Sequence, residues 1–447
     1  MIAMTAAEIA AIVGGKLHGD DVRVTREPVF DSRRAVEGSL FLALVGENGD
    51  GHNFIDDAFS RGAVLALTTR EVGERCIVVP DVLEALARLA SYVRGELRNL
   101  KVIAVTGSQG KTTTKDLLYS VLSGQGDTIA TEESFNNEIG LPITILRCTH
   151  ETKFCVVEMG ARHAGDITAL CAISKPDIGV VLKVGSAHLG EFGSVEMIAQ
   201  TKGELISALG PHGIAILGLY DRYTPEMRAR HNGAVLTFGE ESSADIRATD
   251  IEMREGAPHF ELVTAAGREA VGMNLIGAHQ VSNALATAAV CTALHIPLDY
   301  IASALSSATF SSKWRMELSE VDGTLFINDA YNSNPDSVAA ALSTLALFAQ
   351  ERGGESWAFL GKMHELGESS RSEHEAVGTL VHELGIDHLI AIACDEYGAV
   401  ARHYPDVASA LELIPFISQG DVLLFKASRA EKFEEVAEIV KGAWVNR

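Results

Sequence analysis

The segment V-T-G-S-Q-G-K-T-T-T-K, residues 105–115, carries residue types that hold nucleotide phosphates in proteins. The usual phosphate-binding loop reads G-x-x-x-x-G-K-[ST]. Val105 stands at the first glycine position, so the loop is shortened here to G-x-x-G-K-T. Gly107 and Gly110 allow backbone N–H groups to point at an anion, and the start of the following helix adds partial positive charge. The segment therefore predicts an ATP site in a distinct branch of NTPases.

The side chains of this loop predict how phosphates and a metal ion are held. Lys111 can reach the β- and γ-phosphates, and the Thr112 hydroxyl can bind Mg²⁺. The alternative is a strand-to-helix turn that merely needs glycine, and it is disfavoured because G-K-T lies between an apolar run and a helical stretch. A phosphate loop alone could serve a kinase, a motor or a GTPase, although no N-K-x-D element selects guanine. The loop residues predicted to contact ATP are Gly107, Ser108, Gln109, Gly110, Lys111, Thr112 and Thr113.

Three residues further along the chain could also take part in the chemistry. Glu158 follows a strand-like run, where a carboxylate can hold Mg²⁺. His188 and Lys202 lie close together in the sequence, and a neutral imidazole can bind a metal ion. A single histidine is more often structural, and a lysine more often forms a surface salt bridge, here to Glu191 or Glu204. On the residues alone, both interpretations stay open.

Composition limits the class of protein. The chain has a formal net charge of −23, which argues against general binding of nucleic acids or of anionic membranes. No run approaches the roughly 20 apolar residues of a membrane span, and the N-terminal stretch reads as an amphipathic helix. The six cysteines have no metal-site spacing, so we expect them to be buried thiols in a reducing compartment. We expect a cytoplasmic protein.

The elements that must position these residues follow an α/β pattern. At roughly 150 residues per domain, 447 residues correspond to about three domains. Apolar runs at 41–46, 63–69 and 76–80 predict strands in the first domain, and residues 81–97 predict an amphipathic helix. Later runs rich in Val and Ile predict buried parallel strands. These later runs are residues 102–107, 154–160, 177–185, 213–218 and 234–239, and then 325–331, 357–363, 388–393 and 421–428.

A polar junction at 306–315 separates the two sets of later strands. We therefore predict domains at residues 1–80, 81–312 and 313–447, the last two doubly wound. Ligands of such sheets collect at the carboxyl ends of the strands, which is where the phosphate loop and Glu158 lie.

An ordered series of motifs resembles the Mur ligases, ATP-dependent enzymes of peptidoglycan precursor synthesis. The motifs are T-G-S-Q-G-K-T-T, N-N-E-I-G-L-P (136–142), E-M-G (158–160), A-H-L-G-E-F-G-S, T-K-G-E, G-A-H-Q-V-S-N-A-L-A (277–286), W-R-M-E (314–317) and N-D-A-Y-N-S-N-P-D-S (328–337). D-S-R-R (31–34) and residues 41–55 extend the match to the first domain. The resemblance implies a small α/β N-terminal domain, a central P-loop NTPase-like domain with a parallel sheet, and a Rossmann-like C-terminal domain.

Within the family, N-D-A-Y-N-S-N-P is similar to the members that add D-alanyl-D-alanine. Members that add the third amino acid would show D-Y-A-H-x-P, and the D-N-P-R element of the diaminopimelate-adding enzymes of that class is missing here. The resemblance implies that D-alanyl-D-alanine is joined to the peptide carboxylate of UDP-N-acetylmuramoyl-tripeptide through an acyl phosphate, at the expense of ATP and with two Mg²⁺ sites. One departure is Ala427, because the family commonly has glycine in the K-G-S segment at this strand end. We expect a monomer.

The resemblance also implies residue roles. Lys111, His188 and Lys202 would be catalytic, and Thr112, Glu158, His188 and Lys202 would bind metal, the lysine as a carbamate. ATP would further contact Asn137, His279, Asn283, Arg315 and Asp329. Candidates for the UDP-sugar are Asp31, Ser32, Arg33, Asp50 and His52. Candidates for the peptide or dipeptide carboxylates are Asn332, Asn334, Lys426 and Arg429.

Two alternative functions remain. One stays in the superfamily: another amino-acid-adding Mur ligase or a folylpolyglutamate synthase-like enzyme. The other is a P-loop regulatory ATPase, which would need neither the later motifs nor a third α/β domain.

Overall fold

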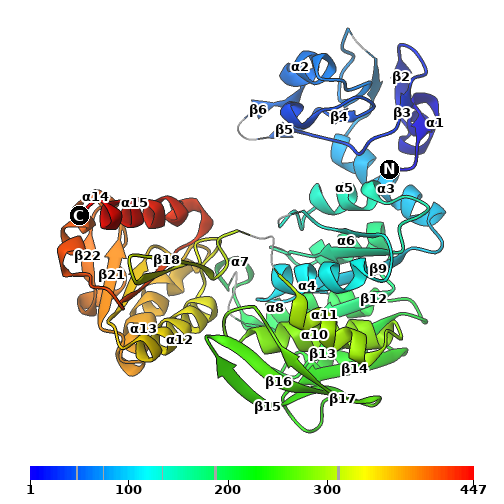
Figure 1. Cartoon of the computed structure of the whole chain (residues 1–447). Helices are drawn as coiled ribbons and strands as arrows, with labels where there is room; N and C mark the ends of the chain where they lie inside the picture. The colour runs from blue at the N-terminus through cyan, green and yellow to red at the C-terminus, as the bar shows by residue number, and fades with distance from the viewer. Residues whose placement is uncertain (47–48, 74, 133, 186–188, 310–312) are drawn as a thin grey trace.

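The computed structural model describes residues 1–46, 49–73, 75–132, 134–185, 189–309 and 313–447. The chain forms an N-terminal lobe, a central lobe and a C-terminal lobe, which lie at the top, lower right and left of Figure 1. Each lobe has a sheet covered by helices, so the predicted α/β class is confirmed. In the described ranges, no helix is long and apolar enough to cross a membrane. All six cysteines are buried free thiols.

The N-terminal lobe is built on a small mixed sheet of order β2-β8-β7-β4. Helix α1 (Ala6–Val13) starts at a capping box, in which the Thr5 side chain accepts from the backbone of Glu8 and the Glu8 side chain accepts from that of Thr5. Helix α2 (Ile55–Ser60) covers the opposite face of the sheet from α1. The strands of the sheet are β2 (Lys16–His18), β4 (Leu40–Leu42), β7 (Leu65–Thr68) and β8 (Cys76–Val78). Two short pairs accompany it, β1 (Met4–Thr5) with β3 (Arg23–Val24) and β5 (Val45–Gly46) with β6 (Gly49–Asp50).

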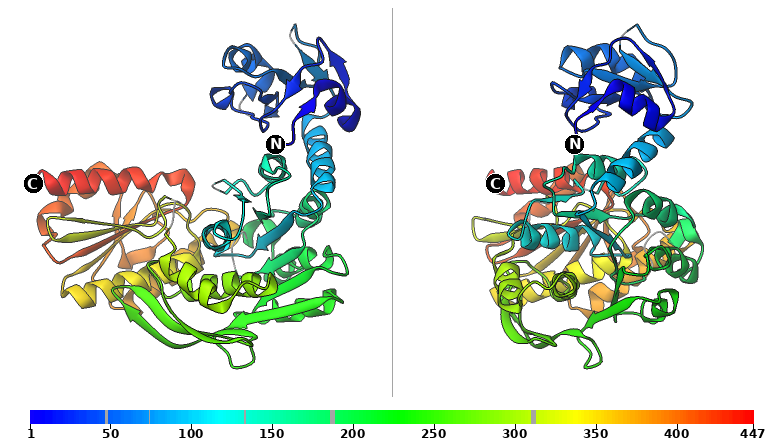
Figure 2. Two further views of the ribbon diagram at one scale, coloured as in Figure 1. Left: turned by 45° about the vertical axis from the view of Figure 1, so that its right-hand side comes forward. Right: turned by 90° about the vertical axis from the view of Figure 1, so that its right-hand side faces the viewer.

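Helix α3 (Val82–Glu96) connects the first two lobes, and the turned views show it rising between them (Figure 2). Its buried face includes Leu86, Leu89 and Val93, which belong to a core that also contains residues of α1 and of the central sheet. Near its end, Arg94 donates to the carbonyl oxygens of Ser174 and Lys175 and to Asp177 Oδ2. The helix therefore belongs to a core that the first two lobes share. The domain boundary predicted at residue 80 stays a prediction.

The central sheet has the order β10-β11-β9-β12-β13-β14-β15-β16-β17. The first seven strands run parallel. These strands are β9 (Lys101–Thr106), β10 (Thr128–Ala130), β11 (Phe154–Glu158), β12 (Ile178–Val181), β13 (Ile214–Gly218), β14 (Ala234–Gly239) and β15 (Ile246–Arg254). The apolar runs predicted five of them, β9, β11, β12, β13 and β14, but not β10 or β15. The sequence did not predict the antiparallel extension of β15 by β16 (Ala257–Thr264) and β17 (Gly267–Gly272), whose polar and half-exposed side chains lack a continuous apolar run.

Helices cover the central sheet on both faces. Along β9, Val102 and Ala104 face one core, and Ile103 and Val105 face the other. Helices on the first face include α3, α5 (Gly140–Arg147), α6 (Asp166–Ser174), α8 (Val195–Lys202) and α9 (Glu204–Ser207), and α7 (Leu189–Phe192) lies beside α8. Helices on the second face are α4 (Lys111–Ser123), α10 (Gln280–Ala293) and α11 (Leu298–Ser307). Burial on both faces explains the continuous apolar runs of these strands.

The C-terminal lobe repeats this architecture around a sheet of order β18-β19-β23-β20-β21-β22, in which only β18 is antiparallel. Its strands are β18 (Glu317–Val321), β19 (Thr324–Asn328), β20 (Ser356–Leu360), β21 (His388–Ile392), β22 (Arg402–Tyr404) and β23 (Val422–Lys426). Its helices are α12 (Pro335–Arg352), α13 (Ser370–Glu383), α14 (Val407–Ala410) and α15 (Phe433–Val445). The carboxyl ends of β19, β20 and β23 meet at one edge.

We predict that Arg94→Ala weakens the packing of α3 on the central lobe. The side chain is 11% exposed, and its loss removes charge-assisted hydrogen bonds to two carbonyls and to Asp177. The expected cost is about 1.5–3 kcal/mol, seen as a lower midpoint of urea denaturation followed by circular dichroism. Arg61→Ala is the matched control, because Arg61 forms only an exposed ion pair with Asp57 within one helical turn. Equal midpoints for both variants would contradict the prediction.

Candidate active site

The phosphate loop joins the end of β9 to the start of α4, as its sequence predicted. Gly110 caps α4 with φ 78°, in the left-handed region that favours glycine. A Cβ atom at this position would lie 2.4 Å from Oδ1 of Asn283. Val105, by contrast, is a fully buried strand residue, so the loop begins after it and needs no glycine there.

Lys111 lies at the first position of α4 and folds back over the loop. Its Nζ donates to the carbonyl oxygen of Gly107 at 2.9 Å, and burial lowers the pKa of its ammonium group. Ser108 fastens the loop to the end of β12, because its Oγ accepts from the N–H of Gly185 at 2.8 Å. The loop thus holds its shape through contacts within the central lobe.

Glu158 and Thr112 lie together in the part of the site that could bind a metal ion. Glu158 ends β11 and is 1% exposed. Its Oε2 accepts from the Thr112 hydroxyl at 2.8 Å, and its Oε1 accepts from Nδ2 of Asn136 at 2.8 Å. A hydroxyl and a carboxylate are hard oxygen donors of the kind Mg²⁺ prefers, so these residues fit the ion. Among the described residues, no group of three or more His, Cys, Asp or Glu side chains could hold a metal by itself.

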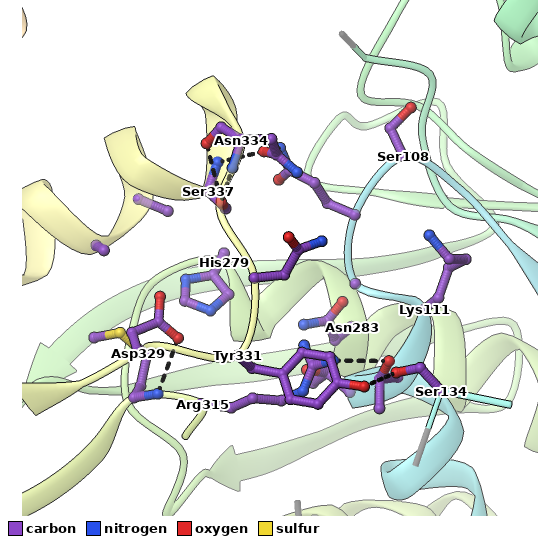
Figure 3. A pocket seen from close by; sticks show the side chains of 18 of the residues that line it. Ser108, Lys111, Ser134, His279, Asn283, Arg315, Asp329, Tyr331, Asn334 and Ser337 are labelled. Carbon is purple, nitrogen blue, oxygen red and sulfur yellow. Dashed lines mark hydrogen bonds between the residues drawn. The ribbon is translucent and has the colours of Figure 1, made fainter. Parts of the chain in front are cut away.

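The C-terminal lobe closes over the loop through polar contacts. Arg315 Nη2 donates to Thr112 Oγ1 at 3.0 Å, and Gln109 Nε2 donates to Asn334 Oδ1 at 3.2 Å. The Arg315 guanidinium carbon also lies 4.1 Å from the centroid of the Tyr331 ring. In the close-up, Arg315, Tyr331 and Asn334 face the loop residues Ser108 and Lys111 across the cavity (Figure 3). The site is therefore completed by two lobes.

The cavity between the two lobes has a volume of about 250 Å³. His279 and Asn283, at the start of α10, line it together with Asp329 and Lys426 of the C-terminal lobe. Asn283 Nδ2 donates to Gln280 Oε1 at 3.0 Å, which fixes its orientation. Burial lowers the pKa of His279 and favours the neutral ring. A polar, partly cationic cavity of this form suits an anionic nucleotide.

Lys426 does not offer a free ammonium group to a substrate carboxylate. Its side chain is 2% exposed, and Nζ contacts Asp329 Oδ2 at 2.5 Å and the carbonyl oxygen of Asn332 at 2.9 Å. A third, longer contact at 3.4 Å goes to the carbonyl oxygen of Asp329. These three acceptors use all three donors of the ammonium group. In this conformation Lys426 positions Asp329.

The other residues predicted for the peptide carboxylates lie in different places. Asn332 lines the cavity, and Asn334 caps α12 by accepting from the N–H of Ser337. Arg429 lines a neighbouring cleft, pairs with Glu434 and lies 4.5 Å from the centroid of the Trp314 indole. The structure brings Asn332 and Asn334 to the nucleotide cavity but leaves Arg429 outside it.

Lys202 is the last residue of α8 and is 4% exposed. Burial and the nearby positive charge of Lys111 lower the pKa of Lys202 to about 7. No carboxylate in the described ranges lies within ion-pair distance of it, and Glu204 instead accepts from Thr168 and from the N–H of Gly165. The salt-bridge alternative is therefore not observed there. His188 lies outside the described residues.

The residues predicted for the UDP-sugar form two separate groups in the N-terminal lobe. Arg33 pairs with Asp31, while the buried Ser32 begins a short 3-10 turn. Asp50 contacts Nδ1 of His52 at 2.6 Å, and its hydrogen bonds with Arg70 and His52 hold the pKa of the Asp50 carboxyl well below its usual range. Within the described residues, no hydrogen bond or ion pair links the two groups, and neither reaches the nucleotide cavity.

Sequence reasoning did not single out Asn136, Ser134 and Tyr331. Asn136 holds Glu158, and the hydroxyls of Ser134 and Tyr331 are hydrogen-bonded across the lobe interface. Asn136 and Tyr331 lie inside motifs that were recognised in the sequence, but no local pattern indicated what either side chain contacts. The predicted Asn137 instead accepts from the N–H groups of Ile139 and Gly140 at the start of α5 and does not line the cavity, so its contact with ATP stays a prediction.

Comparison with known proteins shows to which family a chain with this geometry is similar. Residues 105–291 match the family model of the Mur ligase middle domain, and residues 314–429 match that of the Mur ligase, glutamate ligase domain. The chain is 39% identical to the UDP-N-acetylmuramoyl-tripeptide–D-alanyl-D-alanine ligase of Mycobacterium tuberculosis strain H37Rv, with 98% of each chain covered. It is 32% identical to the protein of that name from Escherichia coli K12, with 99% of each covered.

Solved structures agree. A crystal structure of MurF from Acinetobacter baumannii superposes with a TM-score of 0.90 at 34% identity and covers 98% of this chain and 99% of its own. MurF ligase from Thermotoga maritima in complex with ADP gives a TM-score of 0.83 at 32% identity, covering 95% and 99%. The G51S mutant of L. casei FPGS, with a TM-score of 0.57 at 14% identity and covering 79% of this chain and 94% of its own, shares the fold alone. The chain therefore belongs to the Mur ligase family and groups there with the UDP-N-acetylmuramoyl-tripeptide–D-alanyl-D-alanine ligases.

Proposed function

We propose that this chain joins D-alanyl-D-alanine to the peptide carboxylate of UDP-N-acetylmuramoyl-tripeptide, with ATP converted to ADP and phosphate. The product is UDP-N-acetylmuramoyl-pentapeptide, a precursor of peptidoglycan. ATP and UDP-linked sugars are metabolites of the cytoplasm, so we place the reaction there. The relatives that share the full length of the chain carry the name of this activity.

The observation that carries the proposal is the contact of Arg315 with Thr112 across the lobe interface. The phosphate loop alone would suit any P-loop ATPase. A third lobe that delivers an arginine to this loop, together with Asp329, suits a reaction whose second half takes place between lobes. This arrangement disfavours a regulatory ATPase that needs only the central lobe.

The reaction needs activation because amide formation from a carboxylate and an amine is uphill in water. The tripeptide carboxylate attacks the γ-phosphorus of ATP, the bond to the bridging oxygen breaks, and ADP leaves. The neutral amine of D-alanyl-D-alanine then attacks the acyl carbon, phosphate leaves with the bonding electrons, and the nitrogen releases one proton to solvent. Lys111 and Arg315 stabilise the negative charge that develops on the phosphoryl group. Contacts across the interface, such as Gln109 with Asn334, keep water away from the acyl phosphate.

Thr112 and Glu158 would hold a Mg²⁺ ion, and we assign His188 and Lys202 to a second. When bound, the ions supply positive charge that neutralises the phosphates. In the ion-free arrangement the Thr112 hydroxyl contacts Glu158 directly, so both oxygens already point to one place.

Lys202 would join the metal set as a carbamate. At neutral pH a lysine whose pKa is about 7 is about half neutral, since protonated and neutral forms are equal at the pKa. The neutral amine attacks CO₂, a N–C bond forms, and one proton is released. The carbamate is an anion that can ligate a cation, whereas the ammonium form cannot. The absence of an ion-pair partner in the described residues leaves the amine available for this step.

The decisive experiment measures phosphate release with UDP-N-acetylmuramoyl-tripeptide and ATP. We expect turnover with D-alanyl-D-alanine and none with single amino acids added in turn. Turnover only with a single L-amino acid, on a shorter acceptor, would assign the chain to a different amino-acid-adding Mur ligase. ATP hydrolysis that no acceptor changes would instead favour a regulatory ATPase.

We predict that Arg315→Met lowers kcat/KM for ATP by roughly 100-fold or more, as expected for the loss of one preorganised donor to the phosphoryl group. The variant loses the hydrogen bond to Thr112 and the contact with Tyr331. Steady-state kinetics at varied ATP give the value. Arg371→Met is the control, because Arg371 is exposed on α13 and, among the described residues, pairs only with Glu375, over 3.9 Å. Unchanged kinetics for Arg315→Met would remove the residue from the site.

We predict that Lys202→Ala loses most activity and that a small carboxylate such as acetate or formate restores part of it. The wild-type enzyme should lose activity in bicarbonate-free buffer and regain it when bicarbonate is added. Raising the pH through 7 should favour the carbamate, because the lowered pKa of Lys202 makes the amine neutral there. Lys16→Ala, on the exposed strand β2, is the control. Full activity of Lys202→Ala would exclude the carbamate.

A further inference from the structure

Asp336, in the first turn of α12, has a carboxylate oxygen without a partner. Oδ2 of Asp336 is buried, and no donor in the described part of the chain hydrogen-bonds to it. A buried acceptor left without a partner costs roughly 1–3 kcal/mol, so such groups in native structures commonly await a ligand or water. Asp336 lies in the motif N-D-A-Y-N-S-N-P-D-S but takes no part in the contacts described for the nucleotide cavity.

This oxygen faces the phosphate loop across the lobe interface. A Cβ atom on Gly185 would lie 2.6 Å from Oδ2 of Asp336 and 3.5 Å from Cβ of Ser108. The N–H of Gly185 donates a hydrogen bond to Ser108 Oγ, so the Asp336 carboxylate reaches the edge of the loop that binds phosphates. Asn334, two residues earlier, contacts Gln109 of the same loop, and the close-up shows Asn334 and Ser337 at the start of α12 opposite Ser108 (Figure 3).

A carboxylate next to phosphates is unfavourable unless a cation lies between them. The cations of the site have other partners, because Lys111 donates to Gly107 and Arg315 donates to Thr112. Lys183 is the remaining neighbour: its Cε lies 3.7 Å from the same Cβ position on Gly185. In the described structure, Lys183 forms no ion pair with Asp336. The place between Asp336 and the loop is thus suited to a cation that arrives from outside.

We propose that Asp336 binds the α-ammonium group of the incoming dipeptide and holds its nitrogen beside the acyl phosphate. The proposal rests on the proposed function and names the residue that recognises one end of its second substrate. The α-amino group of a peptide has a pKa of roughly 7.7–8.0, so most of the dipeptide arrives as a cation at neutral pH. A carboxylate on the C-terminal lobe recognises that cation only after the lobe has closed.

With Asp336 in this position, the enzyme should prefer a dipeptide with a free amine over one with an acylated amine. A dipeptide with an acylated amine carries no positive charge and would leave the buried carboxylate without its partner. The C-terminal lobe thereby favours a dipeptide whose amine is not blocked. The bound ammonium group passes one proton to the Asp336 carboxylate, and the nitrogen lone pair then attacks the acyl carbon. Gly185 has no side chain, which leaves the space that this contact needs.

The test uses Asp336→Asn in the full-length enzyme. We expect KM for D-alanyl-D-alanine to rise roughly 10- to 100-fold, the range expected for one charge-assisted hydrogen bond, while KM for ATP and for the UDP-linked tripeptide stays unchanged. Hydroxylamine, an uncharged nucleophile at neutral pH, should still trap the acyl phosphate at the wild-type rate. N-acetyl-D-alanyl-D-alanine should inhibit the variant more strongly than the wild type, because the variant has no buried carboxylate that the blocked amine would leave without a partner.

Asp299→Asn is the matched control, because Asp299 also lies in the first turn of a helix, α11, but far from the loop. It should leave all constants unchanged and so account for any effect of helix charge. An unchanged KM for the dipeptide in Asp336→Asn, as expected if water satisfies Oδ2, would overturn the proposal. An equal loss of hydroxylamine trapping would also overturn it, because Asp336 would then serve ATP or its metal. If the wild-type enzyme traps no acyl phosphate, the proposed function fails instead.

Discussion

The hydroxyl of Thr112 lies where the two reacting halves of the molecule meet. It donates to Glu158 of the central sheet and accepts from Arg315 of the C-terminal lobe. A single oxygen can serve both partners only when the lobes are closed, so the geometry of the phosphate site depends on closure. The chemistry benefits from the same dependence, since an acyl phosphate exposed to water would hydrolyse. The two α/β lobes and their sheets bring these three side chains together at one edge of the cavity.

The negative charge of the expected ligands explains why several cationic side chains are buried around this contact. Burial lowers the pKa of both Lys111 and Lys202, and a nearby positive charge lowers it further, that of Arg315 for Lys111 and that of Lys111 for Lys202. Without ligands such a group of cations is unfavourable in a low dielectric. A triphosphate or a substrate carboxylate brings the opposite charge, so binding relieves repulsion that the protein stores in its free form. Lys426 is different, because Asp329 already compensates its charge.

The sequence predicted the parts of the site that obey local rules. The phosphate loop depends on a strand, two glycines and a helix start, all of which lie within a few residues, and the structure has them where expected. Strands buried on both faces were visible as apolar runs. Strands β16 and β17 were not visible, because their stability comes from pairing at the edge of the sheet with one side in water. Side-chain partners were equally hidden: nothing local distinguishes Asn136, which holds Glu158, from Asn137, which holds a turn.

Contacts between distant segments are the part that only a fold can supply. Arg94 binds the end of α6 and the start of β12, about 80 residues away, and so fastens the helix that carries the N-terminal lobe. The same helix contributes Leu86, Leu89 and Val93 to a core shared by both lobes. The N-terminal lobe fixed in this way shares an apolar core with the central lobe. The C-terminal lobe meets the central lobe through the polar contacts of Arg315 and Asn334 with the phosphate loop and also through Phe348, which lies against Gly256. The polar contacts of this second interface complete the phosphate site, so the shape of the site depends on how the C-terminal lobe is held.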